Sequence, residues 1–362
     1  MGICKSTLIG GSQSTASTQD LLDWGKPPVD PPEDEKDPNE LVLQSWAFCK
    51  AKHSAAKMYH TEADAARNRK LFAWRERPNF IELNCGDDSF FVSNTHRVIG
   101  IADGVGGWKK KGVDPSLFSN TLMKNAKLFA ETHRKEIDPE VIMDAAYRKT
   151  IKDKEVKAGS STACIAALRQ AENGKHYLDV ANLGDSGLLL VRDRRPIFRV
   201  HEKVHRFNAP FQLAVVPQQF QGRSLSDPVS ACVRESIPVQ KGDVVVMGTD
   251  GLFDNRFNEE LAAEAGWIGH TEGTVLRFIP FIGFWFSSIF KDQQVEYVNP
   301  YRVVERLVLD THKASLKTDG NSPWAVMLRQ YGAKDAQGGK EDDVTVVLSR
   351  VTPRREIVED SA

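Results

Sequence analysis

Aspartate residues beside glycine are the feature of this sequence with the clearest chemical potential. They occur in five segments, each next to an apolar run: Gly86-Asp87-Asp88, Asp103-Gly104-Val105-Gly106-Gly107-Trp108, Leu183-Gly184-Asp185-Ser186, Gly248-Thr249-Asp250-Gly251-Leu252-Phe253-Asp254 and Glu341-Asp342-Asp343. A single Asp-Gly pair is typical of a surface turn. Several such segments at strand ends would bring carboxylates near the core, where a cation must neutralise them. The pattern predicts a metal centre that draws its carboxylates from these segments.

The type of ligand indicates the metal. Carboxylates and backbone carbonyls are hard oxygen donors that suit magnesium or manganese, and no histidine or cysteine stands at matching places. Neighbouring side chains on a strand point to opposite faces, so only one aspartate of each adjacent pair can face the site, and we expect Asp88 and Asp342 to do so. The sequence contains no His-Glu-x-x-His, Walker A or Gly-x-Ser-x-Gly motif, so zinc-protease, P-loop and serine-hydrolase chemistry lack their residues.

Short apolar runs rich in β-branched residues predict the strands that would carry these aspartates. They cover residues 89–93, 98–102, 162–168, 177–182, 188–191, 244–247 and 344–348. Tight turns between several of them favour antiparallel pairing. Aspartate followed by proline predicts a helix start at Asp114-Pro115 and at Asp138-Pro139, and a further helix is expected after Pro300. Helices grouped between runs of strands indicate an α+β fold in which helices cover sheets.

Five motifs occur in the order seen in the type 2C (PP2C, or PPM) family of metal-dependent protein serine/threonine phosphatases. They are Asp103 to Trp108, Gly159-Ser160-Ser161-Thr162, Gly184-Asp185-Ser186, Asp250 to Asp254 and Asp342-Asp343-Val344-Thr345. Residues 112–116 and 207–213 resemble the branch of that family that contains a mitochondrial matrix phosphatase. The resemblance covers roughly residues 82–352. It implies a four-layer α/β/β/α sandwich of two central antiparallel sheets flanked by helices, and hydrolysis of phosphoserine and phosphothreonine in proteins.

The resemblance also implies roles for individual residues. Asp103 would bridge two manganese or magnesium ions that share an activated water, and Gly104 would offer its carbonyl to one ion. The shells would be completed by three further aspartates: Asp88, Asp250 and Asp342. A third, weaker ion would be held by a set that overlaps these: Asp185, Asp250 and Asp254. Two divalent ions lower the pKa of a shared water and stabilise the charge that develops in an in-line displacement, so no protein nucleophile is needed.

Two positions depart from the family pattern. The arginine that binds phosphate in many members corresponds here to Leu83, and a histidine proposed as the general acid corresponds to Val105. These tasks would then rest on metal-bound water or on another cation, for which the candidates are Arg77, Arg97 and the lysines at 109–111. One alternative to the enzyme therefore stays open, a catalytically weak PP2C-fold protein that acts as a regulator or as a membrane-tethered adaptor.

Composition limits the partners. The 362 residues carry 48 basic and 49 acidic side chains, a net charge of −1, so no global field would hold the protein on nucleic acid. We expect a phosphoprotein substrate, no nucleic acid and a monomer. The five cysteines are scattered and show no Cys-x-x-Cys spacing, which favours reduced thiols over a disulfide framework.

The chain divides into one domain with flanking segments. Residues 1–40 are polar and rich in proline and predict a flexible leader, residues 41–355 a single PP2C-like domain, and residues 356–362 a tail. An aromatic-rich insertion is expected around residues 266–298. Its apolar run at 278–290 is too short to span a bilayer, and either buried core or an exposed patch remains open for it.

The first residues resemble a membrane-targeting signal. Met1-Gly2-Ile3-Cys4-Lys5-Ser6 fits N-myristoylation of Gly2, with Cys4 open to palmitoylation. Two acyl signals are needed for stable anchoring, so the pattern predicts the cytoplasmic face of a membrane, with the cytoplasm as the location without acylation. A mitochondrial location is the alternative. It is disfavoured because residues 1–19 contain one lysine and no arginine.

Overall fold

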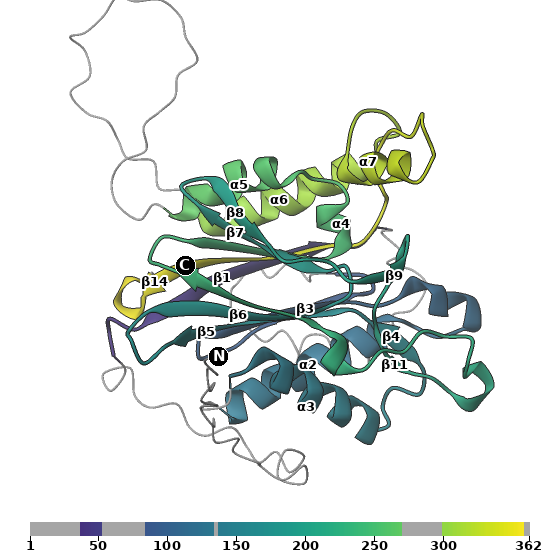
Figure 1. The fold of residues 1–362 in the computed structure, drawn as a ribbon, viewed down its shortest axis with the longest axis horizontal. Coiled ribbons are helices and arrows are strands. Elements are labelled where there is room, and N and C mark those ends of the chain that lie inside the picture. Colours follow the sequence, from purple (N-terminus) through teal and green to yellow (C-terminus); the bar gives the residue numbers. More distant parts are fainter. Residues whose placement is uncertain (1–36, 53–83, 134–136, 270–298, 358–362) are drawn as a thin grey trace, which may run out of the picture.

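Two five-stranded antiparallel sheets form the centre of the protein. The computed structural model describes residues 37–52, 84–133, 137–269 and 299–357 (Figure 1). The first sheet consists, in spatial order, of β1 (Leu41–Lys50), β14 (Val344–Pro353), β13 (Val244–Gly248), β7 (Gly187–Arg192) and β8 (Arg195–Arg199). The second sheet consists of β12 (Val233–Val239), β6 (His176–Leu183), β5 (Ala163–Gln170), β3 (Val98–Asp103) and β2 (Asp88–Val92).

Helices cover the outer face of each sheet, so the layers run helix, sheet, sheet, helix (Figure 1). The helices on the second sheet are α2 (Ser116–Thr132) and α3 (Pro139–Lys152), and those on the first are α4 (Asp250–Phe253), α5 (Asn258–Ala265) and α6 (Pro300–Ser315), with α7 (Pro323–Gln330) beyond its edge. Two small pairs complete the strands: β4 (Gly159–Ser161) with β11 (Leu213–Val215), and β9 (Val204–Arg206) with β10 (Ala209–Pro210). The predicted four-layer α+β sandwich is confirmed.

An aspartate or asparagine side chain caps the start of α3 and of α6, whereas the N-cap residue of α2 is Pro115, which provides no side-chain cap. The Glu140 N–H donates to Asp138 Oδ1 at 2.8 Å, and the Tyr301 N–H donates to Asn299 Oδ1 at 3.0 Å. At α2 the Ser116 N–H donates to an oxygen of Asp114 at 3.0 Å. The apolar stripe of α2 is fully buried against the second sheet, with its members Phe118, Leu122, Ala126 and Phe129 at most 1% exposed. Local sequence therefore determines these helices.

Strand β1 is the largest element that the sequence did not reveal. It follows the proline-rich leader and contains Gln44 and Ser45, which break its apolar run. Its partner is distant, because Leu41 pairs with Pro353 in β14. Gln44 is almost fully buried and accepts a hydrogen bond from Arg350 of β14 at 2.6 Å. Long-range pairing therefore stabilises a strand that local preference does not indicate.

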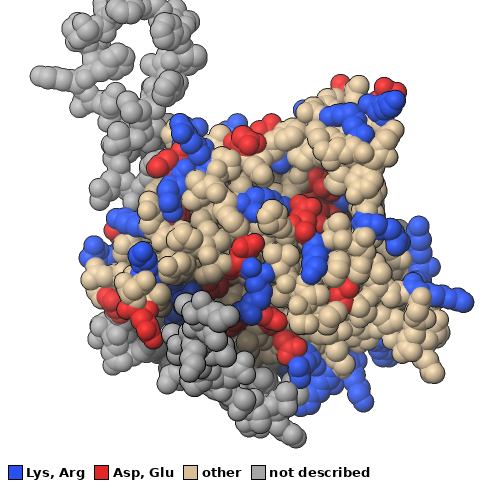
Figure 2. Space-filling model, in the orientation of Figure 1, with Lys and Arg blue, Asp and Glu red and all other residues tan. Residues whose placement is uncertain are grey.

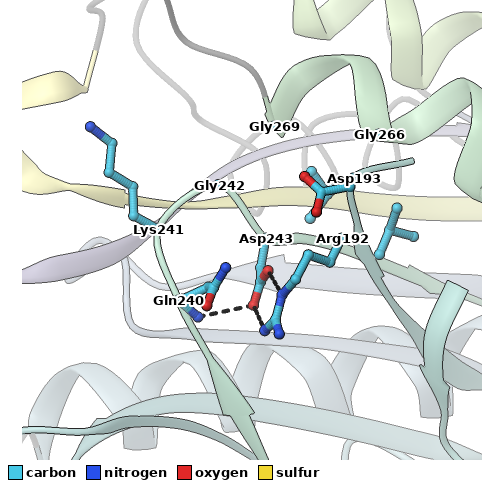
Figure 3. A pocket seen from close by; sticks show the side chains of 10 residues that line it. Arg192, Asp193, Gln240, Lys241, Gly242, Asp243, Gly266 and Gly269 are labelled. Carbon is cyan, nitrogen blue, oxygen red and sulfur yellow. Dashed lines mark hydrogen bonds and ion pairs between the residues drawn. The ribbon is translucent and has the colours of Figure 1, made fainter. Parts of the chain in front are cut away.

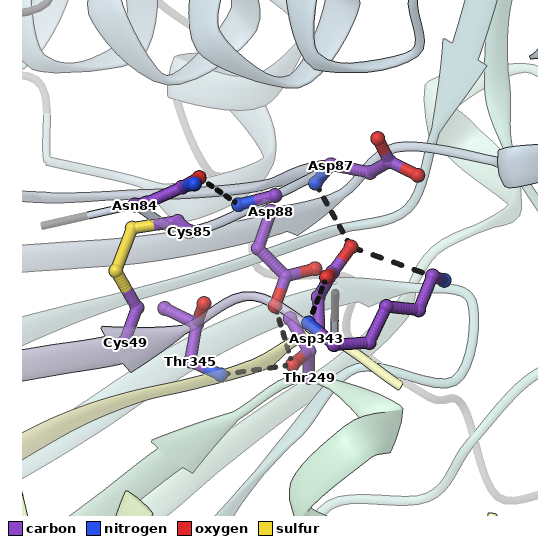
Figure 4. The surroundings of a disulfide bond; sticks show 10 residues. Cys49, Asn84, Cys85, Asp87, Asp88, Thr249, Asp343 and Thr345 are labelled. Carbon is purple, nitrogen blue, oxygen red and sulfur yellow. Dashed lines mark hydrogen bonds and ion pairs between the residues drawn. A yellow bond between two sulfur atoms is a disulfide. The ribbon is translucent and has the colours of Figure 1, made fainter. Parts of the chain in front are cut away.

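A disulfide bond joins Cys49, near the end of β1, to Cys85 in the turn before β2 (Figure 4). The prediction of reduced thiols is wrong for this pair. The two residues are 36 positions apart in sequence, but the Ala51 N–H donates to the Asn84 carbonyl at 2.9 Å and brings the two segments together. Cys164 is a buried free thiol, and its burial raises its pKa to about 12. Sequence spacing alone could not show the approach of β1 to β2.

Several predicted features lie outside the described residues. They are Gly2, Cys4, Arg77, Leu83 and the apolar run at 278–290. Within the parts of the chain that the structure describes, no helix has both the length and the apolar character needed to cross a membrane.

Candidate metal centre

The four principal aspartates come together at one end of the two sheets. Asp88 and Asp103 stand directly opposite each other on the paired strands β2 and β3 of the second sheet. In the first sheet, Asp250 begins α4 two residues after β13, and Asp342 lies two residues before β14, the strand that pairs with β13. Thr249 links the sheets, because its hydroxyl donates to Asp88 Oδ2 at 2.9 Å. The end of the sandwich therefore carries four carboxylates from four segments.

The structure distinguishes the members of the two adjacent aspartate pairs. Asp343 is 4% exposed, and its carboxylate accepts backbone N–H groups of Asp87 at 2.9 Å and Lys52 at 2.8 Å. The Asp87 carboxylate turns away from that of Asp88 (Figure 4). It lies 2.6 Å from Lys109 Nζ. Asp343 and Asp87 are thus held by contacts of their own. Asp88 and Asp342 therefore remain the candidates of the two pairs for the centre.

Asp103 is positioned by the Gly159 to Thr162 motif. Its N–H donates to Thr162 Oγ1 at 3.0 Å, and its carbonyl accepts from the Thr162 N–H at 2.9 Å and from Ser161 Oγ at 2.7 Å. Thr162 Oγ1 also lies 2.8 Å from Ser186 Oγ, beside Asp185. These contacts explain why the two Ser/Thr-containing motifs accompany the aspartates. They fix the main chain on both sides of the candidate bridging residue.

Gly104 is required by its surroundings. Its N–H donates to the Asp87 carbonyl at 3.0 Å. A Cβ atom at this position would lie 2.7 Å from the carbonyl oxygens of Asp87 and Pro115, and no real side chain tolerates such a contact. Glycine therefore allows the chain to pass close to β2 while its own carbonyl stays available beside Asp103.

Asp185 and Asp254 lie near enough to Asp250 for their charges to interact with it. Asp185 lies in the β6–β7 turn, after Gly184 at a φ of 113°. Burial and then the Asp250 charge raise its pKa well above the usual carboxyl range. Burial also raises the pKa of Asp254, to about 7, with a further contribution from Asp250. The structure therefore brings the two remaining predicted site residues into the same cluster.

Mutual repulsion dominates the electrostatics of this cluster. Asp88 is 2% exposed, and burial followed by the charges of Asp343 and Asp342 raises its pKa well above the usual range. Asp103 is half-buried, and its pKa is raised by desolvation and by Asp250 and Asp88. A raised carboxyl pKa means that the ionised form is disfavoured where it stands. A cation bound among these carboxylates would favour their ionised form and lower their pKa values.

The donor set fits a divalent ion. Among the buried carboxylate oxygens that accept no hydrogen bond from the described residues, three belong to predicted ligands, namely Asp88 Oδ1, Asp185 Oδ1 and Asp250 Oδ1. Within the described ranges no three acidic, histidine or cysteine side chains already converge as closely as a bound ion requires. Lysine ammonium groups stand between the carboxylates instead. Oxygen donors with free lone pairs and no nearby histidine suit magnesium or manganese.

Two lysines of the cluster were not anticipated from the sequence. Lys52 Nζ lies 2.7 Å from Asp342 Oδ1, and Lys340 Nζ contacts carboxylate oxygens of Asp250 and Asp254. Burial opposes the charge of both lysines, yet the carboxylates outweigh it and raise the pKa of each. The position of Lys340 two residues before Asp342 was the one available signal. Lys52 carried none, because β1 itself was not predicted.

Acidic and basic side chains are interspersed over the face in Figure 2.

The structure also sorts the candidates for the missing phosphate-binding arginine. Arg97 precedes β3, whereas Asp103 ends it, and Arg97 lies 3.9 Å from Glu40. Arg97 is thus at the far end of the strand, about 20 Å away at 3.3 Å per residue, and is wrong as a candidate. Lys111 turns to the Trp108 ring, 4.2 Å from its centroid. Lys109 remains beside the cluster.

A cavity elsewhere in the protein takes no part in this centre. It lies between the β7–β8 turn, the β12–β13 turn and Gly266–Gly269 (Figure 3). Arg192 Nε crosses it to Asp243 Oδ1 at 2.7 Å. Asp243 immediately precedes β13 and Asp250 follows it, so the cavity and the aspartate cluster lie at opposite ends of the same strand.

We expect manganese to stabilise the protein more at about pH 7.5 than at about pH 5. Asp88, Asp103, Asp185 and Asp254 have raised pKa values in the fold. These carboxyls lose their protons at a higher pH in the folded protein than in the unfolded chain. Without metal, the folded state therefore loses stability as the pH rises above the ordinary carboxyl pKa, and a bound cation removes this loss. Thermal melting of chelated and manganese-loaded protein at both pH values tests the expectation. Asp88→Asn should weaken the pH dependence of the chelated protein, and an equal manganese effect at both pH values would contradict it.

Comparison with known proteins adds independent observations. Residues 93–272 match the family model described as "Stage II sporulation protein E (SpoIIE)". Over 269 residues the chain is 36% identical to a protein phosphatase PTC7 homolog of Xenopus laevis, which covers 74% of this chain and 81% of that protein. The Homo sapiens PTC7 homolog is 36% identical over 270 residues, with 74% and 79% covered. The X-ray structure of the photosystem II phosphatase PBCP superposes with a TM-score of 0.61 at 22% identity, over 86% of this chain and 99% of that one, and so shares the fold.

Proposed function

Because this chain belongs to the PP2C-type (PPM) family of metal-dependent protein serine/threonine phosphatases, we propose that it hydrolyses phosphoserine and phosphothreonine in proteins at the aspartate cluster, with two manganese or magnesium ions. Such ions lower the pKa of a shared water and offset the charge that develops on the phosphoryl group. The protein residues hold and orient these partners. The observation that carries the proposal is the meeting of carboxylates from both sheets, with buried oxygens that lack a hydrogen-bond donor.

The proposed ligands divide between the two sheets. Asp103 would bridge the ions, because it lies opposite Asp88 and its charge interacts most with that of Asp250. Asp88, whose Oδ2 is fixed by Thr249, would present its free oxygen to one ion. The carbonyl of Gly104 and the carboxylate of Asp342 would complete the set. Catalysis would then depend on Asp88, Asp103 and Asp250 together, and no side-chain nucleophile would be required.

Hydrolysis of phosphopeptides by chelated and metal-loaded protein tests this function. We expect turnover of phosphothreonine and phosphoserine peptides only after manganese or magnesium is restored, and slower turnover of a phosphotyrosine peptide of the same sequence. Unchanged turnover after chelation would contradict the metal-dependent reaction. Binding of the peptide and the metal with no turnover would instead support the alternative hypothesis of a regulatory protein with a phosphatase fold.

Lys52 is the proposed replacement for the phosphate-binding arginine. Its backbone N–H is fixed by Asp343 at 2.8 Å, and its ammonium stands at Asp342, with 24% of the side chain exposed. A lysine held in this way can meet a phosphate as a point charge. Lys109, which is 52% exposed beside Asp87, is the second candidate.

We expect Lys52→Met to raise KM for a phosphopeptide by about tenfold to a hundredfold, because a hydrogen bond to a charged group contributes about 1.5–3 kcal/mol. Steady-state kinetics at saturating manganese measure the change. Lys110→Met, at an exposed position of the same protein, serves as the control and should leave KM unchanged. A rise in KM with Lys109→Met but not with Lys52→Met would assign the phosphate contact to Lys109 instead.

The N-terminal sequence supports anchoring of the protein to a membrane. Gly2 and Cys4, in a segment that fits the N-myristoylation pattern, would supply the two acyl signals that stable anchoring requires. The protein would then act on phosphoproteins at the cytoplasmic face of a membrane, as a monomer. Mass spectrometry of the native N-terminal peptide tests this. An unmodified Gly2 would leave the protein in the cytoplasm, and a cleaved leader would favour the mitochondrial alternative.

A further inference from the structure

Lys340 lies among the carboxylates that the family resemblance assigns to a third metal ion. Its Nζ atom is hydrogen-bonded to a carboxylate oxygen of Asp250 and lies 2.8 Å from Asp254 Oδ2 and 3.4 Å from Asp342 Oδ2. Asp185 is near enough for its charge to interact with those of Asp250 and Lys340. An ammonium group therefore contacts carboxylate oxygens of two of the three residues that a third ion would need, Asp250 and Asp254.

The main chain holds Lys340 in this place. Its N–H donates to Asn255 Oδ1 at 2.8 Å, and its carbonyl accepts from Asn255 Nδ2 at 2.9 Å. The same Nδ2 donates to the carbonyl of Gly251, next to Asp250, at 2.9 Å. A Cβ atom at Gly339 would lie 2.7 Å from Asn255 Oδ1, so glycine is needed for this close approach. Asn255 thus joins the segment of Lys340 to the helix that begins with Asp250.

An aromatic ring completes the surroundings of the ammonium. Lys340 Nζ lies 5.1 Å from the centroid of the Trp324 ring, and the backbone N–H of Trp324 donates to the Asp254 carbonyl at 2.8 Å. Ser322, which caps α7, donates its hydroxyl hydrogen to the Gly338 carbonyl at 2.5 Å. A cation over an indole face gains electrostatic stabilisation. Hydrogen bonds thus join the start of α7 both to Asp254 and to Gly338, which stands two residues before Lys340.

We propose that the Lys340 ammonium is the resident cation of this place, so that Asp185, Asp250 and Asp254 hold no third metal ion. The inference rests on the proposed two-ion centre, which Asp250 would share. A divalent ion bound at about 2.0–2.1 Å from these oxygens would come into contact with Nζ, and the two positive charges would repel each other. Lys340 thus acts as a positioning residue. It fixes the Asp250 carboxylate without any demand for a further ion.

The number of manganese ions bound per chain tests this inference, measured on the full chain by equilibrium dialysis and metal analysis. We expect the wild type to bind two ions even at millimolar free manganese. Lys340→Gln removes the charge and should gain a third ion, whereas Lys340→Arg keeps the charge and should still bind two. The double variant Lys340→Gln with Asp185→Asn should lose the third ion again. Lys334→Gln, at an exposed lysine before β14, is the matched control and should bind two.

Three ions bound to the wild type would overturn the inference. This result needs no variant, so it decides the matter even where Lys340→Gln fails to fold. A folded Lys340→Gln protein that still binds two ions would also overturn it. Failure of the proposed function gives a different result, because a wild type that binds no manganese lacks the two-ion centre itself and overturns both proposals.

Discussion

Asp103→Asn should abolish metal-dependent phosphatase activity while leaving the fold intact. The substitution keeps the size of the side chain but removes the charge that would be shared by two ions. Metal-ion catalysis supplies several kcal/mol of transition-state stabilisation, so we expect kcat to fall by on the order of 10³-fold. Manganese affinity should fall as well. Steady-state kinetics with a phosphothreonine peptide, together with manganese titration, measure both effects.

Stability separates this effect from misfolding. The pKa of Asp103 is raised by desolvation and by Asp250 and Asp88, so loss of its charge relieves repulsion in the chelated protein. Chelated Asp103→Asn should therefore melt no lower than chelated wild type at about pH 7.5. Asp193→Asn, at an exposed turn with a φ of 51° that asparagine tolerates, is the matched control. Activity of Asp103→Asn within tenfold of wild type would contradict the assigned role.

Removal of the disulfide should cause the largest loss of stability. Cys49 and Cys85 close a loop across 36 positions, and chain entropy predicts about 3–4 kcal/mol for a loop of that length. For a domain of this size the loss corresponds to a fall in Tm of about 10 °C. We expect Cys49→Ala with Cys85→Ala to show it in thermal melting without reductant, and wild type to approach the same value in reductant.

A cysteine that takes no part in the bond provides the control. Cys232 is a half-buried free thiol, so Cys232→Ala should change Tm by little and should leave the response to reductant unchanged. A double variant as stable as the wild type would show that the bond does not contribute to the fold. The measurement should be made with and without manganese, because Cys85 lies three residues before Asp88 in the chain.

The features that local sequence determines were predictable. Aspartate before proline marked the starts of α2 and α3, and runs of β-branched residues marked most strands of both sheets. Alternation along a strand predicted that Asp88 rather than Asp87 faces the site, and in the structure Asp87 contacts Lys109. Motif order then indicated the family, and family membership indicated the four layers. The helix starts, the strands and each single motif depend on residues that are close together in the chain.

Features that depend on distant parts of the chain were not predictable. Strand β1 pairs with β14 about three hundred residues later. This pairing places Lys52 beside Asp342 and Cys49 beside Cys85. Asp343 was interchangeable with Asp342 in the sequence, and only its backbone partners, Asp87 and Lys52, show that it acts as an anchor. A charged residue reveals its partner only when the fold brings the two together.

Anomalous diffraction from crystals grown with manganese tests the central claim most directly. We expect two manganese peaks, both within coordination distance of the Asp103 carboxylate, with Asp88, Asp250 and Asp342 on their other sides. Manganese bound away from Asp103, or a single ion that Asp103 does not contact, would contradict the proposed two-ion centre.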